Sequence, residues 1–226
     1  MKKSDPEVPV IAIDGPSASG KGTVAQGVAR ALGFHYLDSG AIYRVLGLAA
    51  LRAGVKVADE SAVFQLLLRI DIGFVEGQVR LDAADVTDAI REERAGEAAS
   101  RVSAHPRVRE ALTAKQRAFR KPPGLVADGR DMGSVIFPDA RLKIFLTASA
   151  EARAQRRYKQ LIGNGLNANM TALLQDIMLR DQRDSERTTA PLKQVADAIA
   201  LDTTNLTATQ AIAEVLARYH ALQRVH

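Results

Sequence analysis

Residues 10–23 restrict the fold of this chain more than any other stretch of its sequence. An apolar run ends at Asp14, a loop of small residues occupies Gly15–Gly20, Lys21 follows, and a helical pattern begins at Val24. A strand, a glycine loop, a lysine and a helix in this order form a cradle for phosphate groups, because the loop N–H groups, the helix N-terminus and the lysine all attract anions. The stretch therefore predicts a P-loop that binds a nucleoside triphosphate.

This loop departs at one position from the common pattern G-x-x-x-x-G-K-[ST]. The two glycines and the lysine match, but Gly22 stands where a hydroxyl residue is expected, and Thr23 comes one place later. We expect the hydroxyl that lies near the phosphates or Mg²⁺ to come from Thr23 or from Ser19, and the sequence leaves both open.

Composition sets the class of protein. The chain has 226 residues, of which 46% are hydrophobic and 25% charged, so it is long enough for one sizeable core. It has no apolar run of about 18 residues, and no apolar signal core follows its N-terminal lysines. It has no cysteine, which excludes disulfides and thiolate chemistry. We expect a cytoplasmic enzyme that does not bind a membrane.

The charge is basic, since 31 Lys and Arg outnumber 26 Asp and Glu for a net charge of +5. Such a chain binds either nucleic acid or small phosphorylated molecules. Aromatic residues make up only 4% of the chain and tryptophan is absent, which leaves little material for stacking bases. We favour small phosphorylated molecules, and a P-loop protein that binds nucleic acid is the alternative from another class.

Short apolar runs alternate with helical patterns, which is typical of an α/β fold with a parallel sheet between helices, here a three-layer fold. The carboxyl ends of parallel strands meet at one edge of a sheet, where ligands of such folds bind. Asp14, Asp38, Asp128 and Asp202 all stand at the ends of predicted strands. The sequence therefore predicts one polar ligand edge.

Two segments interrupt the alternation within a single predicted domain, residues 1–226. Apolar and polar residues alternate over 71–81 around Glu76-Gly77, which predicts a β-hairpin inside an insertion at about 60–105. A glycine-rich break at 163–165 precedes a helix predicted over 170–187 and suggests a mobile lid at about 158–170.

Arginines accompany the predicted ligand edge. Arg44 and Arg130 lie beside turns, and the helix at 170–187 carries Arg180, Arg183, Asp184 and Arg187 at i, i+3, i+4 and i+7. Three arginines on one face repel each other unless an anion lies among them, although a solvated charged face is the plainer alternative.

This pattern indicates phosphoryl transfer, in which catalysis is mostly positioning and charge neutralisation by lysine, arginine and Mg²⁺. An acceptor that is itself a phosphate needs no general base, and no base motif stands out. An acceptor hydroxyl would need one, which Asp38 or Asp131 could supply, so a kinase of a hydroxyl metabolite is an open alternative, as is a UMP kinase.

Four segments together resemble bacterial cytidylate kinases: I-D-G-P-S-A-S-G-K-G-T at 13–23, L-D-S-G-A-I-Y-R at 37–44, D-G-R-D-M-G at 128–133 and R-D-Q-R-D-S-E-R at 180–187. P-R-V-R-E-A-L at 106–112 is also similar to this family, and the G-K-G-T ending of the loop is typical of it. The resemblance spans almost the whole chain and implies a monomeric kinase that uses ATP and Mg²⁺ to phosphorylate CMP and dCMP to their diphosphates in pyrimidine nucleotide metabolism.

The resemblance also implies a set of site residues. For ATP it implies Gly15, Pro16, Ser17, Ala18, Ser19, Gly20, Lys21, Gly22, Thr23, Arg156 and Arg157, with Arg153 nearby. For CMP it implies Ser39, Arg44, Ser100, Arg109, Arg130, Asp131, Arg180, Asp184 and Arg187. Lys21, Arg130 and Arg180 would be catalytic, and Mg²⁺ would be held mainly by the ATP phosphates. Ser100 has an alternative role in plain helix packing.

Overall fold

A computed structural model describes residues 8–75, 77–163, 165 and 167–224 and divides the chain into two compact units. The first unit comprises Met1–Leu37, Arg117–Glu186 and Ala190–His226, and the second comprises Asp38–Gln116 and Arg187–Thr189. The predicted insertion at 60–105 lies inside the second unit, which is longer at both ends. Glu76 of the predicted hairpin, Asn164 of the glycine break and the N-terminal lysines lie outside the described residues.

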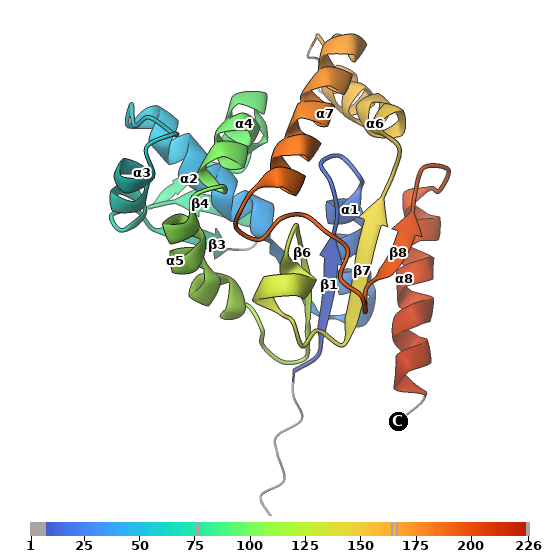
Figure 1. The fold of residues 1–226 in the computed structure, drawn as a ribbon. Helices are drawn as coiled ribbons and strands as arrows, with labels where there is room; N and C mark the ends of the chain where they lie inside the picture. Colours follow the sequence, from blue (N-terminus) through green and yellow to red (C-terminus); the bar gives the residue numbers. More distant parts are fainter. Residues whose placement is uncertain (1–7, 76, 164, 166, 225–226) are drawn as a thin grey trace, which may run out of the picture. The chain divides into compact units, whose positions relative to one another are not determined.

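A five-stranded sheet organises the first unit (Figure 1). Its order is β2-β6-β1-β7-β8. The strands are β1 (Val10–Asp14), β2 (His35–Asp38), β6 (Leu125–Gly129), β7 (Leu142–Thr147) and β8 (Ile199–Asp202). β1 is parallel to both β6 and β7, and β7 is parallel to β8. The predicted α/β class is therefore confirmed, and β1, β2, β6 and β8 end at the expected aspartate or next to it.

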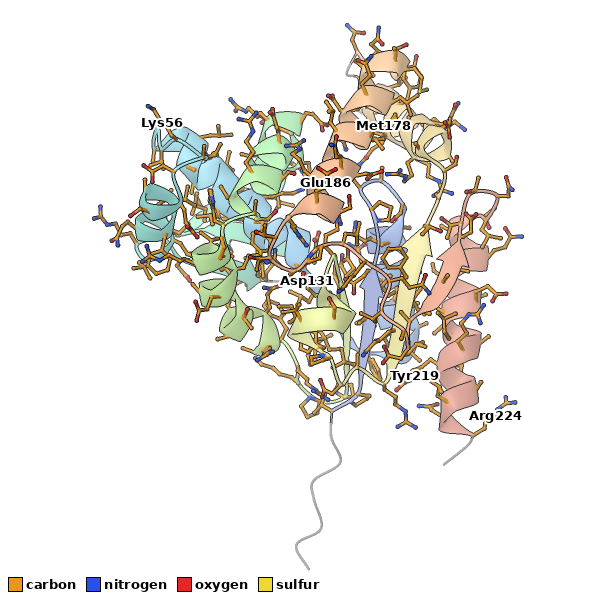
Figure 2. The ribbon with its side chains drawn as sticks, in the orientation of Figure 1. Lys56, Asp131, Met178, Glu186, Tyr219 and Arg224 are labelled. Carbon is orange, nitrogen blue, oxygen red and sulfur yellow. The ribbon has the colours of Figure 1, made fainter. Side chains whose placement is uncertain are left out.

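The core of this unit explains why β1 is central. All five of its residues are buried, as expected for a strand covered on both faces. Two helices, α1 (Lys21–Leu32) and α8 (Ala208–Gln223), pack against each other and supply apolar side chains to the same core. Tyr219 on α8, labelled in Figure 2, is buried and meets the ring of Phe34 edge-on at 5.8 Å between centroids.

Three further helical segments complete the first unit. One π-helical turn, η2 (Met132–Ile136), follows β6 and was not anticipated from the sequence. The other two are α6 (Ala150–Gly163) and α7 (Met170–Glu186), which pack together. The helix predicted over 170–187 thus ends at Glu186, so Arg187 does not continue the predicted helical stripe.

The second unit is a small helical bundle with its own sheet. Its helices are α2 (Ser39–Arg52), α3 (Glu60–Leu67), the short η1 (Ala89–Arg91), α4 (Glu93–Val102) and α5 (Pro106–Arg117). The predicted hairpin is confirmed as antiparallel β3 (Ile72–Val75) and β4 (Gln78–Leu81), and a third short strand, β5 (Ala84–Asp85), was not predicted.

Close packing of α2 on α4 depends on Gly47. A Cβ atom at this position would lie 2.8 Å from the backbone nitrogen of Ala99, closer than side chains approach. Helix α2 starts at Ser39 because the Asp38 carboxylate accepts a hydrogen bond from the Ala41 N–H at 2.9 Å. Among all described helices of the protein, none has both the length and the apolar character needed to cross a membrane.

Candidate functional site

The phosphate loop, Gly15–Thr23, has the backbone geometry that a cradle requires. A Cβ atom on Gly15 would lie 2.1 Å from the Leu146 carbonyl oxygen, so only glycine fits between β1 and β7. Ala18 and Gly20 have positive φ angles of 58° and 90°, and Gly20 immediately precedes α1. Left-handed residues of this kind turn successive N–H groups toward one side, which makes a concave anion site.

Lys21 is the first residue of α1 and folds back over this loop. Its Nζ donates to the Pro16 carbonyl oxygen at 3.3 Å, and the side chain is half-buried. A full positive charge is thus held at the mouth of the loop, next to the positive end of a helix dipole. This is the position from which a lysine neutralises the outer phosphates of a nucleotide.

A cleft of about 520 Å³ opens beside the loop and lies entirely within the first unit. Ser19 and Thr23, the two hydroxyl candidates, both line it. Thr23 is exposed, whereas Ser19 is buried and its Oγ has no hydrogen-bond partner within the described part of the chain. Thr23 therefore offers an exposed hydroxyl at the cleft, whereas the hydroxyl of Ser19 is buried in the wall of the phosphate loop.

Arg156 and Arg157 of α6 line the same cleft. The guanidinium of Arg156 donates to the Ser19 carbonyl at 3.0 Å and to the Thr203 Oγ1 at 3.1 Å, with a further bond to the Thr203 carbonyl. Thr203 was not singled out from the sequence, yet it is buried and its hydroxyl lies 3.2 Å from the Ser19 carbonyl. It ties the loop after β8 to the phosphate loop.

Arg153, near the start of α6, contacts the phosphate loop and α7. Its guanidinium donates to the carbonyls of Ala148 and Ser17 at 3.0 and 3.1 Å. It also forms a two-pronged ion pair with Asp181 of α7, at 3.0 and 2.5 Å. The Arg153 side chain is 6% exposed and that of Asp181 is 29% exposed, so this pair is partly shielded from water. It connects the phosphate loop to α6 and α7.

Arg130 forms a buried ion pair in the first unit. Its Nε donates to the Asp184 Oδ2 at 2.6 Å, and the two side chains are only 16% and 7% exposed. Burial by itself would lower the pKa of Arg130, but the negative charges of Asp184, Asp128 and Asp14 outweigh it and raise that pKa. Arg130 is therefore a permanent cation, pre-oriented after β6 by a carboxylate on α7.

The predicted arginine stripe on α7 is only partly realised. Asp184 is buried and Arg180 is half-buried. Arg183 is exposed and donates to the Leu179 carbonyl of its own helix, so it belongs to the solvated surface. Asp131 directly follows Arg130 and is buried; Figure 2 labels it at the segment that follows β6.

Asp14 was identified from the sequence only as the last residue of a predicted strand. Its two carboxylate oxygens accept hydrogen bonds from the backbone N–H groups of Met132 and Gly133, both at 2.8 Å. Burial raises the pKa of Asp14 to about 6 in spite of these two bonds, and the nearby charge of Asp131 adds to the effect. The phenol of Tyr36 similarly donates to Asp128 at 2.6 Å.

In the second unit, Arg44 lies on α2 with its guanidinium against α4. It donates to the Ile90 carbonyl at 2.8 Å, and a Cβ on Gly96 would lie 3.1 Å from one of its terminal nitrogens. Gly96 thus leaves a flat space for the guanidinium. Ser39, the first residue of α2, is buried.

Ser100 and Arg109 are both buried in this unit. Arg109 donates to the Ser103 carbonyl at 3.1 Å, and its guanidinium lies 5.7 Å above the centre of the Tyr43 ring. The Ser100 Oγ has no hydrogen-bond partner in the described part of the chain. A buried hydroxyl without a partner is costly in a purely structural role, which weakens the packing alternative for Ser100.

Comparison with known proteins decides the family. The family model described as cytidylate kinase matches residues 11–221. The chain belongs to the cytidylate kinase family. Curated cytidylate kinases from Burkholderia pseudomallei and Paraburkholderia phymatum are 58% and 57% identical to it over 224 residues, covering 98% of this chain and of each relative. A cytidylate kinase from Cupriavidus necator is 57% identical over 216 residues, covering 96% of this chain and 97% of the relative.

For this member of the cytidylate kinase family, the quoted motifs fall on defined elements. Segment 13–23 is the end of β1, the phosphate loop and the start of α1. Segment 37–44 ends β2 and starts α2, segment 128–133 joins β6 to η2, and segment 180–187 ends α7. Each motif thus lies at the carboxyl end of a strand or at a helix terminus, where polar groups are presented.

Proposed function

We propose that this protein transfers the γ-phosphate of ATP to CMP and to dCMP, and releases CDP or dCDP together with ADP. The observation that carries the proposal is the identity of 57–58% to curated cytidylate kinases along nearly the full length of both chains. The phosphate loop, with Gly15 wedged against Leu146 and Lys21 at its mouth, supports ATP as the phosphate donor.

The loop N–H groups and the Lys21 ammonium hold the ATP phosphates in this proposal. The cleft of about 520 Å³ receives the remainder of ATP, with Arg156 and Arg157 at its wall. The ATP-binding residues are Gly15, Pro16, Ser17, Ala18, Ser19, Gly20, Lys21, Gly22, Thr23, Arg156 and Arg157. These groups place positive charge around the transferred group, which is how phosphoryl transfer is catalysed.

Mg²⁺ fits this site as an ion that ATP carries. The described residues hold no cluster of three or more His, Asp or Glu side chains that could bind a metal without the nucleotide. The Ser19 and Thr23 hydroxyls lie at the cleft and are the oxygen ligands that the chain itself offers. Bound in this way, Mg²⁺ neutralises charge on the triphosphate.

CMP recognition is assigned to the residues that the family resemblance implies. They are Ser39, Arg44, Ser100, Arg109, Arg130, Asp131, Arg180, Asp184 and Arg187. Arg44 and Arg130 bind the CMP phosphate, Asp184 the ribose hydroxyls, and Ser100, Arg109 and Asp131 the cytosine edge. The guanidinium is suited to phosphate because it donates two parallel hydrogen bonds.

The acceptor in this reaction is a phosphate oxygen that is already anionic. No side chain has to remove a proton from it, so the chain's own task is to align the two phosphate groups and screen their repulsion. Lys21, Arg130 and Arg180 are the catalytic residues in this sense. We further propose a cytoplasmic monomer that binds no nucleic acid, which size-exclusion chromatography and a DNA-binding titration test.

The decisive experiment measures ADP release with CMP, dCMP, UMP, AMP, GMP and no acceptor, each with ATP and Mg²⁺. We expect CMP and dCMP to be phosphorylated far faster than AMP and GMP. Turnover confined to AMP or GMP, or equal ADP release without any acceptor, would contradict the proposal. Omission of Mg²⁺ with excess chelator is expected to abolish turnover while leaving the protein folded.

A further inference from the structure

Asp14 connects the phosphate loop to the segment after β6, which carries Arg130 and Asp131. It is the last residue of β1, directly before the phosphate loop, and lies opposite Gly129 in the β1–β6 register. Its carboxylate reaches past Arg130 and Asp131 to the N–H groups of Met132 and Gly133, at 2.8 Å each. These two amides open the π-helical turn η2.

The first amides of a helical turn are usually capped by the residue that precedes it. Aspartate at the N-cap normally accepts a hydrogen bond from the N–H group two or three residues further along the chain. Asp131 occupies this position before η2, but its side chain makes no capping hydrogen bond. Asp14, which lies 119 residues before Gly133 in sequence, accepts from the Gly133 amide in its place.

We propose that Asp14 is a positioning residue for CMP recognition: by capping η2 itself, it keeps the Asp131 carboxylate from turning back onto the Gly133 amide. This rests on the proposed function, in which Asp131 contacts cytosine. Asp14 touches neither nucleotide and acts through the segment that carries Arg130 and Asp131.

The contact of Asp14 with the N–H groups of Met132 and Gly133 requires a carboxylate. Both oxygens of Asp14 accept from N–H donors, whereas an asparagine would present one oxygen and one NH₂ group, and the latter repels an amide N–H. The charged groups that face Asp14 are Arg130 and Asp131. The stem of Lys143 packs on Gly133, 3.1 Å from where its Cβ would lie, while the Lys143 ammonium is paired with Asp197.

The test is a double-mutant cycle on CMP kinetics with Asp14→Asn, Asp131→Asn and the double variant. In Asp14→Asn, the Asp131 carboxylate is expected to replace the missing cap and leave cytosine. We therefore expect each single change to raise the KM for CMP by about tenfold, and the double variant to be no worse than either, since the two changes remove the same contact. The KM for ATP is expected to change by less than about threefold.

A matched control changes an aspartate that caps a helix elsewhere. Asp59 accepts from the Ala62 N–H at 3.0 Å at the exposed start of α3, and Asp59→Asn is expected to leave both KM values unchanged. If Asp14→Asn and Asp131→Asn multiply in their effects on the KM for CMP, the two residues act independently and the proposal is wrong. Equal losses of ATP and CMP affinity in Asp14→Asn would also refute it, since they indicate general damage.

A second variant covers the case in which Asp14→Asn does not fold, as judged by circular dichroism. Gly133→Ala would place a Cβ 3.1 Å from the Lys143 stem, so either that stem or the backbone at the start of η2 must shift by a few tenths of an ångström, while the Asp14 carboxylate is kept. It is expected to raise the KM for CMP by a few fold, an effect that Asp131→Asn does not increase further. An unchanged KM would overturn the proposal. Failure of the wild-type protein to phosphorylate CMP would instead remove the proposed function.

Discussion

The phosphate loop of the first unit and the arginine-bearing helices of the second unit present polar groups in different ways. In the loop, backbone N–H groups form the cradle, and its shape is enforced by Gly15, which lies against the Leu146 carbonyl, and by Gly20 with its positive φ. In the second unit the polar groups are long side chains, Arg44 and Arg109, each held by a backbone carbonyl acceptor.

This difference determines what each region tolerates. A backbone cradle depends on sterics at a few glycines and little on the identity of other side chains. A side-chain site depends on the partner that orients each guanidinium, so a change at the partner moves the charge without removing it. Two residues depart from this contrast and so test it. Lys21 is a side chain that acts in the backbone cradle, and Gly96 is a glycine that acts in the site made of side chains.

Lys21→Ala is expected to have the largest effect. It removes the ammonium charge at the mouth of the backbone cradle, and we expect kcat to fall by about 10³-fold with little change in the unfolding temperature. Steady-state ADP release and thermal unfolding measure the two quantities, with Lys56→Ala, at an exposed site, as the control. A loss of less than about tenfold would show that the loop amides suffice and that the lysine is dispensable.

Arg130→Ala is expected to follow. It removes a phosphate-binding group and leaves the Asp184 carboxylate, which is 7% exposed, without its 2.6 Å partner. We expect kcat/KM for CMP to fall by about 10²-fold and stability to drop by about 3 kcal/mol, because a buried charge then lacks compensation. Arg183→Ala, on the exposed side of α7, is the control. Unchanged CMP kinetics would separate Arg130 from substrate binding.

The phosphate loop was predictable from sequence because its signal is local. Nine consecutive residues carry the glycines and the lysine, and backbone geometry follows from them directly. The alternating strands and helices were predictable for the same reason. The helix over 170–187 was predicted one residue too long, since no breaker marks Glu186, and the short strand β5 carried too few residues for an alternating pattern.

The contacts that orient the site were not predictable in this way. Asp14 and its amide partners are separated by 118 and 119 residues, and Thr203 and Ser19 by 184. No local pattern identifies such a pair, because the fold brings them together. The CMP residues of the second unit came from the family resemblance, since Ser100 and Arg109 stand in ordinary helical surroundings and their role stays a prediction.

Asp14 combines the two ways of presenting polar groups, since its side chain orients backbone amides. The shifted pKa of its carboxyl group predicts that the stability of the protein depends on pH. Its pKa is about 6 in the folded protein and 3.8 ordinarily, so the folded state binds the proton more tightly. Its contribution to stability is therefore present below pH 4 and is lost as the pH rises through 6. The difference of about 2 pKa units corresponds to about 3 kcal/mol.

Urea unfolding of the wild type and of Asp14→Asn, from pH 4 to pH 7, measures this dependence. The free energy of unfolding of the wild type minus that of the variant is expected to fall by about 3 kcal/mol over this range. The subtraction removes the titration of the carboxylates that do not interact with Asp14, which both proteins share. A difference that stays level or rises with pH would show that burial does not destabilise the Asp14 carboxylate.

Gly96→Ala is expected to have the smallest effect, and it tests whether the second unit relies on side chains alone. The added Cβ would lie 3.1 and 3.2 Å from the terminal nitrogens of Arg44, so the guanidinium must shift by a few tenths of an ångström. We expect the KM for CMP to rise about threefold with kcat nearly unchanged, because the charge is kept and only its position changes.

Gly73→Ala on β3 is the matched control, since its Cβ would make an ordinary contact at 3.7 Å. An unaltered KM for CMP in Gly96→Ala would mean that the Arg44 guanidinium adjusts freely, and that the second unit tolerates a steric change of the kind that the phosphate loop does not. A loss as large as that of Arg130→Ala would mean the opposite. The flat space left by a missing side chain would then matter as much in the second unit as Gly15 does in the phosphate loop, and the contrast between the two regions would fail.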